Sequence, residues 1–142
     1  MKKALGLAVL MLFAVSTAAQ AQTVVGSKHD MTTILTGTTD EVCKYCHAPH
    51  NRATYALWNR ENPTGPYTMY NSTYSPTIDM TVGAAPGQQS LICLSCHDGS
   101  IAYDAYTGNP AADATVMTNA TTAFIDTDLT DDHPVGVTYD TG

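Results

Sequence analysis

The hydrophobic residues of the chain form one long run near its start and follow no sustained period elsewhere. That run extends from Ala4 to Val15, is preceded by two lysines, and leads to Ala19-Gln20-Ala21, which has small residues on both sides of a glutamine. About a dozen apolar residues are too few for a membrane-spanning helix, which needs about 20. The order of basic, apolar and small residues is typical of a cleaved secretory signal. We therefore predict a signal peptide at residues 1–21 and a single mature domain at residues 22–142.

Two short helices are predicted around the two cysteine pairs of the mature chain. The first carries Cys43–His47, with N-cap candidates at Thr38–Asp40 and with Pro49 limiting its length. The second opens at Gly87–Ser90 and stops at Asp98–Gly99, where the glycine suits the left-handed conformation that often ends a helix.

The other segments show little regular period. The pattern predicts a short strand within residues 22–27, a loop or turn at 28–31, and a turn followed by a short extended run at 131–139. Residues 51–86 contain four prolines and are predicted to be irregular, and residues 110–117 give only a weak indication of a helical turn. The mature chain should therefore consist mostly of loops.

Composition adds that this chain has little material for an ordinary core. It is rich in Thr, Asp, Asn and Gly, and its 6 basic and 13 acidic residues give a net charge of −7. Loss of Lys2 and Lys3 with the signal makes the mature chain −9. So acidic a surface argues against nucleic acid and anionic membranes as partners. Solubility outside the cytoplasm accounts for most of this charge.

All four cysteines lie in two copies of the pattern Cys-x-x-Cys-His, at Cys43–His47 and Cys93–His97. This is the attachment signature of c-type haem: two thiols one helical turn apart form thioethers with the vinyl groups of one porphyrin, and the next residue directs an imidazole at the iron. Disulfides, a zinc site or a redox dithiol are the alternatives for such cysteines. None of them requires the histidine that follows both pairs, so we predict two haem c groups, bound through Cys43, Cys46, Cys93 and Cys96.

Two haems would also supply the missing core, because each is a large apolar disc around which loops can condense. The predicted fold is accordingly a set of irregular loops with a few short α-helices around two covalently attached haems, with little or no sheet. In this reading the aromatic residues of the segment 51–86 cover the porphyrins, and Trp58 packs rather than relays electrons.

The axial ligands can be counted. His47 and His97 are predicted as the proximal ligands, which leaves two axial positions for His29, His50 and His133. His50 lies three residues after His47 and cannot reach the other face of the same iron, so it would bind the second iron and bring the haems close together.

The other two distal candidates have different local surroundings. His133 has Asp131 and Asp132 beside it, and a carboxylate could orient its ring, whereas His29 lies ahead of the first motif. Which two of the three distal candidates bind iron stays open. Methionine is the competing ligand, but with three spare histidines bis-histidine ligation is favoured. Irons without an open position carry electrons, so we predict an electron-transfer protein and not an enzyme.

With these residues the chain resembles the multihaem c-type cytochromes with paired Cys-x-x-Cys-His motifs, in particular subunits of extracellular cytochrome filaments. The resembling pieces are Lys28-His29-Asp30, residues 43–50, Leu57-Trp58-Asn59-Arg60, residues 93–99 and Asp132-His133-Pro134-Val135-Gly136. The familiar filament subunits carry four or more haems, whereas this chain has two motifs.

The resemblance implies closely stacked bis-histidine haems, little regular secondary structure and an extracellular location. It also implies that the chain polymerises with copies of itself, with His29 or His133 as candidates for binding a haem of the neighbouring subunit. Redox proteins or extracellular electron acceptors are the expected partners, without nucleic acid or membrane insertion. The alternatives are a monomeric periplasmic dihaem shuttle and, less favoured, a dihaem peroxidase or reductase.

Overall fold

The computed structural model describes residues 23–35, 39–50, 55–71, 73–109 and 115–138. The chain divides into two units, residues 1–30 and residues 31–142. The predicted signal peptide, Thr38 and residues 110–114 of the predicted helical turn lie outside the described residues. Residues 115–117, at the end of that turn, are irregular.

In the first unit, the strand predicted within residues 22–27 is wrong over its described part, because residues 24–27 form a turn flanked by bends. The amide of Ser27 donates to the Val24 carbonyl over 2.9 Å, and Gly26 has a φ of 76°. The Gly26 amide also donates to the Asp30 carboxylate over 2.8 Å. A glycine with positive φ, held by a side chain four residues later, favours a tight turn over an extended strand. Residues 28 and 29 form the predicted turn.

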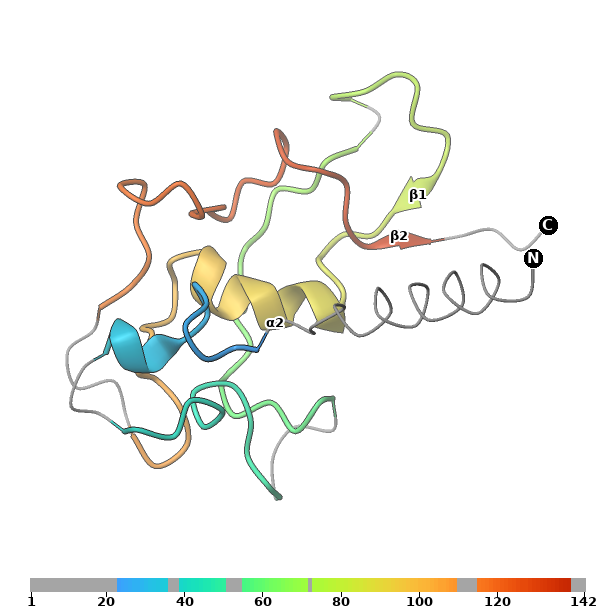
Figure 1. Ribbon diagram of the computed structural model, residues 1–142. Helices are drawn as coiled ribbons and strands as arrows, with labels where there is room; N and C mark the ends of the chain where they lie inside the picture. Colours follow the sequence, from blue (N-terminus) through green and yellow to red (C-terminus); the bar gives the residue numbers. More distant parts are fainter. Residues whose placement is uncertain (1–22, 36–38, 51–54, 72, 110–114, 139–142) are drawn as a thin grey trace, which may run out of the picture. The chain divides into compact units, whose positions relative to one another are not determined.

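The second unit contains few regular elements, as the sequence predicts (Figure 1). The 3₁₀ turn η1 covers Met31–Thr33, and the helix α2 covers Gln88–His97. The strands β1 (Thr81–Val82) and β2 (Val137–Thr138) pair antiparallel, with Thr81 opposite Thr138 and Val82 opposite Val137. β2 is the extended run expected near the end of the chain. The other described residues form turns and loops.

The helix α2 carries the second cysteine motif and begins and ends where the sequence predicts. Gly87 is its N-cap, and the amide of the C-cap Asp98 bonds to the Leu94 carbonyl. Gly99 follows with a φ of 73°, the left-handed conformation that commonly ends a helix. The helix therefore stops directly after His97.

The first motif does not form the predicted helix. Residues 42–46 are consecutive turns, although the His47 amide does reach the Cys43 carbonyl over 2.8 Å, as in one turn of an α-helix. Thr39 caps this turn through its hydroxyl, which accepts the Glu41 amide over 3.2 Å. The next amide, that of Ala48, donates to the Leu57 carbonyl over 2.9 Å. This bond to a later segment redirects the chain, and Pro49 has no amide hydrogen with which to extend a helix.

Two small hydrophobic clusters hold the second unit together. The buried members are Met31, Tyr45 and Tyr106 in the first cluster, and Met69, Leu94 and Leu129 in the second. The Tyr45 and Tyr106 rings meet edge to face with centroids 5.4 Å apart, a favourable aromatic geometry. Cys46 packs against the first cluster, and Leu94, between the cysteines of α2, belongs to the second. Each cysteine motif is thus anchored on its own cluster.

Candidate haem-binding site

The two cysteine motifs present their thiols in the same way. The first cysteine of each pair, Cys43 or Cys93, is exposed, and the second, Cys46 or Cys96, is partly buried. None of the four is in a disulfide. In α2 a spacing of three residues places both thiols on one face. In the first motif the turn bond from the Cys46 amide to the Cys43 carbonyl, 3.2 Å long, keeps the pair together.

His47 is held from two sides by the segment that follows the first motif. Its Nδ1 lies 2.8 Å from the Ala56 carbonyl oxygen. Its ring meets the Trp58 ring edge to face, with centroids 5.8 Å apart and an interplanar angle of 85°. Ala56 and Leu57 have positive φ values of 57° and 51°, which are unfavourable for residues with a side chain. This local conformation places a carbonyl group against the imidazole.

His97 has an equivalent partner in a different part of the chain. Its Nδ1 lies 2.7 Å from the Ala123 carbonyl oxygen. Its own carbonyl accepts the Ile125 amide over 2.8 Å. The loop that contains residues 123–125 therefore fixes both the ring and the main chain at the end of α2.

The two carbonyl contacts determine which nitrogen of each ring carries the proton. A carbonyl oxygen can only accept, so Nδ1 of His47 and of His97 must be the donor. A neutral imidazole protonated at Nδ1 has its lone pair on Nε2. Metal-binding histidines usually have this arrangement, with the other ring nitrogen donating to a carbonyl or carboxylate. Nε2 is therefore the nitrogen through which either motif histidine could bind a metal.

A second observation also fits a haem. The indole Nε1 of Trp58 is buried and has no hydrogen-bond acceptor among the described residues. Buried donors nearly always have a partner, and haem carries propionate carboxylates that can accept hydrogen bonds. The donor set and this buried indole are both consistent with a haem at the first motif.

Two consecutive residues, Asn59 and Arg60, connect the two motifs. The Asn59 amide donates to the Cys46 carbonyl over 2.9 Å, and its side-chain amide donates to the Lys44 carbonyl over 2.6 Å. Arg60 reaches α2, where its guanidinium donates to the Ser95 carbonyl over 2.8 Å. Segments that are far apart in the sequence are thereby brought together next to Cys46 and Cys96.

The pKa values of the partly buried thiols reflect this proximity. Burial raises the pKa of Cys46, and the charge of Cys96 raises it further, while the Arg60 guanidinium opposes the shift. Burial also raises the pKa of Cys96, again against the influence of Arg60 and of a hydrogen bond with Ser95. The Arg60 guanidinium therefore acts on both of the partly buried thiols.

The thiols should consequently differ in reactivity before haem is attached. In the full-length haem-free chain, iodoacetamide is expected to alkylate the exposed Cys43 and Cys93 first. Alkylation of Cys46 and Cys96 should be slower at neutral pH and should accelerate further into the alkaline range, because the thiolate reacts and their pKa values are raised. Peptide mapping by mass spectrometry over time measures each rate. In urea all four rates should converge, and equal rates in the folded chain would contradict the prediction.

The three candidate distal histidines, His29, His50 and His133, are all exposed. His29 belongs to the unit of residues 1–30, whereas His50 and His133 belong to residues 31–142. The described residues contain no group of three or more His, Cys, Asp or Glu side chains that could hold a metal ion. A haem iron needs fewer protein ligands, since the porphyrin supplies four nitrogens and leaves two axial positions.

The ring of His133 has a main-chain partner in the structure. Its Nδ1 lies 3.1 Å from the carbonyl oxygen of the next residue, Pro134, and not from a carboxylate of Asp131 or Asp132. Burial and the charges of Asp131 and Asp128 raise the pKa of Asp132, which shows that these acidic residues interact with one another. A main-chain carbonyl, and not one of the neighbouring carboxylates, is therefore the group that the His133 ring contacts.

Sequence reasoning missed the carbonyls of Ala56 and Ala123 and the bridging role of Asn59 and Arg60. Every residue has a main-chain carbonyl, so the sequence could not show that those of Ala56 and Ala123 contact the two histidine rings. For Asn59 and Arg60 the sequence offered only their place in the resembling segment Leu57-Trp58-Asn59-Arg60.

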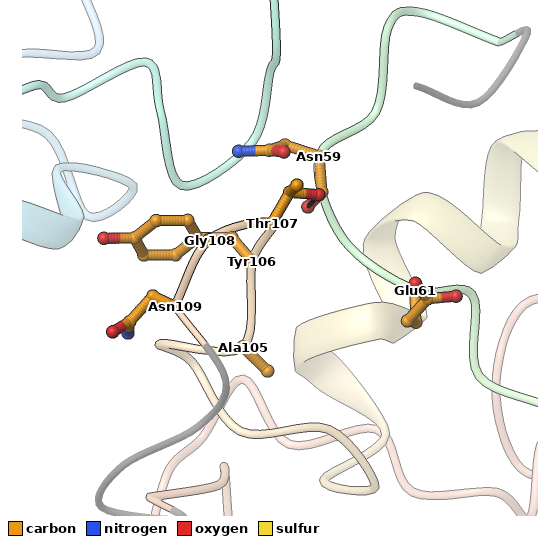
Figure 2. Close-up of a pocket in the computed structure, with 7 residues that line it drawn as sticks. All are labelled: Asn59, Glu61, Ala105, Tyr106, Thr107, Gly108 and Asn109. Carbon is orange, nitrogen blue, oxygen red and sulfur yellow. Dashed lines mark hydrogen bonds between the residues drawn. The ribbon is translucent and has the colours of Figure 1, made fainter. Parts of the chain in front are cut away.

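An open pocket of about 390 Å³ lies close to this bridge (Figure 2). Its lining consists of Asn59, Glu61, Ala105, Tyr106, Thr107, Gly108 and Asn109. Figure 2 shows the turn at residues 106–109 on one side and Asn59 and Glu61 on the other. The pocket contains no cysteine or histidine of either motif, so it is separate from the candidate haem ligands.

No helix within the described part of the chain is long and apolar enough to cross a membrane. Comparison of the sequence with protein-family models and with curated proteins finds no match.

Proposed function

We propose that the protein is a dihaem c-type cytochrome that transfers electrons and carries no catalytic site. The observation that supports this most strongly is shared by the two motifs: each histidine donates Nδ1–H to a main-chain carbonyl, over 2.8 Å at His47 and 2.7 Å at His97. A structural cysteine pair has no need of an adjacent imidazole prepared in this way. Its occurrence at both motifs supports two equivalent attachment sites.

In this proposal the thiols of Cys43 and Cys46 attach one haem, and those of Cys93 and Cys96 attach the other. Each thiol would hold the haem through a thioether bond, formed by addition to a vinyl group that takes up the thiol proton. His47 and His97 would each bind the haem iron through Nε2, while the carbonyls of Ala56 and Ala123 hold the rings in place. A bound haem supplies an iron that takes up and releases one electron.

Two of His29, His50 and His133 would complete the axial positions in this proposal. All three are exposed and therefore accessible. His50 serves the iron of the second motif, because it lies only three residues after His47. Ligation on both faces leaves no position for oxygen or peroxide, which favours electron transfer over catalysis.

Location and assembly follow from sequence features. The basic, apolar and small residues of 1–21 support export. The resemblance to filament subunits supports an extracellular conducting polymer of this chain, in which His29 or His133 binds a haem of the next subunit. A monomeric periplasmic shuttle is the alternative and would use the same motifs.

Haem content and spin state test the proposed function. The full-length protein, produced with a cytochrome c maturation system, should carry two haems that remain bound after denaturation and organic extraction. Ferric electron paramagnetic resonance should show low-spin signals alone. Absence of covalent haem would contradict the proposal. High-spin iron that binds cyanide would favour an open site, as in a peroxidase or reductase.

Assembly is tested separately by electron microscopy of the purified haem protein. Filaments are expected, and a His29→Ala or His133→Ala substitution that removes an intersubunit ligand should shorten them and produce high-spin iron at subunit ends. Isolated particles under all conditions would favour the periplasmic shuttle while leaving the electron-transfer function intact.

A further inference from the structure

Arg60 is a buried cation that neutral groups hold in place. It is 3% exposed. Its guanidinium makes four hydrogen bonds, with the Ser95 hydroxyl at 3.3 Å, the Ser95 carbonyl at 2.8 Å, the Ala102 carbonyl at 2.9 Å and the Tyr103 carbonyl at 2.6 Å. Among the described residues no carboxylate forms an ion pair with Arg60.

Burying the charge of Arg60 costs free energy. A buried charge without a partner of opposite sign loses much of its hydration energy, and hydrogen bonds to carbonyl dipoles recover only part of it. In a poorly hydrated environment the field of the charge is also screened less than at the surface. Arg60 therefore exerts a stronger influence on nearby groups than an exposed lysine or arginine would.

The position of Arg60 directs that influence to both motifs. On one side its neighbour Asn59 bonds to the Cys46 carbonyl. On the other side the guanidinium bonds to Ser95, the residue before Cys96.

We propose that Arg60 is a positioning residue shared by the two haem sites and that its buried charge raises the reduction potentials of both haems. This inference rests on the proposed function. Ferric haem carries one more positive charge than ferrous haem, so a fixed nearby cation disfavours the oxidised form. One residue would in this way keep the two potentials high together and limit the difference between them.

Two substitutions separate the charge of Arg60 from its structural role. Arg60→Gln removes the charge and retains polar groups, whereas Arg60→Lys retains the charge and loses the planar guanidinium with its four contacts. Both should lower the thermal midpoint. In spectroelectrochemical titration, Arg60→Gln should lower both reduction potentials by about 59 mV or more, which corresponds to a tenfold change in each one-electron reduction equilibrium. Arg60→Lys should shift each reduction potential by less than about half of that amount.

Three outcomes would overturn the inference: unchanged potentials in Arg60→Gln, a shift at one haem alone, or equal shifts in the two variants. If Arg60→Gln does not accumulate with two haems, Arg60→Lys decides alone, because lowered potentials with the charge retained would show a structural role. Haem content is measured first in the wild type. A wild-type protein without covalent haem would overturn the proposed function. Two attached haems whose reduction potentials are the same in the wild type and in Arg60→Gln would overturn only the role of Arg60.

Discussion

Under the proposed function, replacing Cys93 and Cys96 with alanine is expected to reduce the covalently bound haem from two groups per chain to one. The proposed thioether bonds form at the cysteine sulfurs, and the exposed Cys93 and partly buried Cys96 are the thiols that α2 presents on one face. Without them, a haem held by His97 alone would be lost on denaturation. Intact-protein mass spectrometry and the alkaline pyridine spectrum of the denatured protein both count the haems that remain.

The matched variant is the replacement of Cys43 and Cys46 with alanine, which should also leave one haem, now attached at α2. Peptide mapping of the two variants should locate the remaining haem on opposite motifs. Cys46 packs against the cluster of Tyr45 and Tyr106, so this variant is expected to be the less stable of the two apoproteins. Retention of two extraction-resistant haems in either variant would contradict the assignment of the motifs.

Substitution of Gly99 by alanine is expected to destabilise the fold more than any other single exchange of glycine for alanine in the described residues. Gly99 has a φ of +73°, and a Cβ there would lie 2.6 Å from the Met117 carbonyl oxygen and 2.6 Å from Cε2 of Phe124. The left-handed conformation costs about 1–2 kcal/mol for a residue with a side chain, and a forced close contact adds about 1–3 kcal/mol. The free energy of unfolding should therefore fall by about 2–5 kcal/mol.

The effect should extend to His97. Phe124 lies between Ala123, whose carbonyl holds the ring of His97, and Ile125, whose amide bonds to the His97 carbonyl. Displacement of this loop would loosen the imidazole, which should appear as a mixed-spin signal at one haem. Chemical denaturation measures the stability, and electron paramagnetic resonance reports the ligand.

Gly108→Ala is the control for backbone conformation. Gly108 has a φ of +86°, but a Cβ there would meet nothing within 4 Å. Its substitution should cost only the conformational term of about 1–2 kcal/mol and should leave the haem spectra unchanged. Equal losses of stability in the two variants would show that the close contacts of Gly99 with residues 117 and 124 do not contribute.

Around the two cysteine motifs, features of the fold that depend on adjacent residues were predicted correctly, and features that depend on distant contacts were not. Gly87 and Gly99 frame α2 as expected, since a helix end is determined by a few adjacent residues. The first motif was predicted as a helix from similar caps, and Thr39 does cap it. That helix stops after one turn because Ala48 pairs with Leu57, a contact that no local pattern contains.

In the candidate site, too, some features depend on adjacent residues and others on contacts between distant segments. The prediction of two attachment motifs needs only the spacing of Cys43, Cys46 and His47 and its repeat in α2. The tertiary structure alone supplies the orientation of the rings, because Ala56 is nine residues from His47 and Ala123 is 26 residues from His97. For His133, the neighbouring acidic residues suggested a carboxylate partner, but the nearest acceptor proved to be the adjoining Pro134 carbonyl.

The sequence by itself therefore determined where chemistry can occur: the cysteine and histidine spacing, the scarcity of regular elements and the end of α2 all depend on adjacent residues. Only the tertiary structure decided how the two motifs are connected. Arg60 contacts residues 35 to 43 positions away, and its partners are mostly main-chain carbonyls, which every residue has. Because such acceptors look alike in a sequence, only the folded chain could reveal that the buried Arg60 bonds to Ser95, the residue before Cys96.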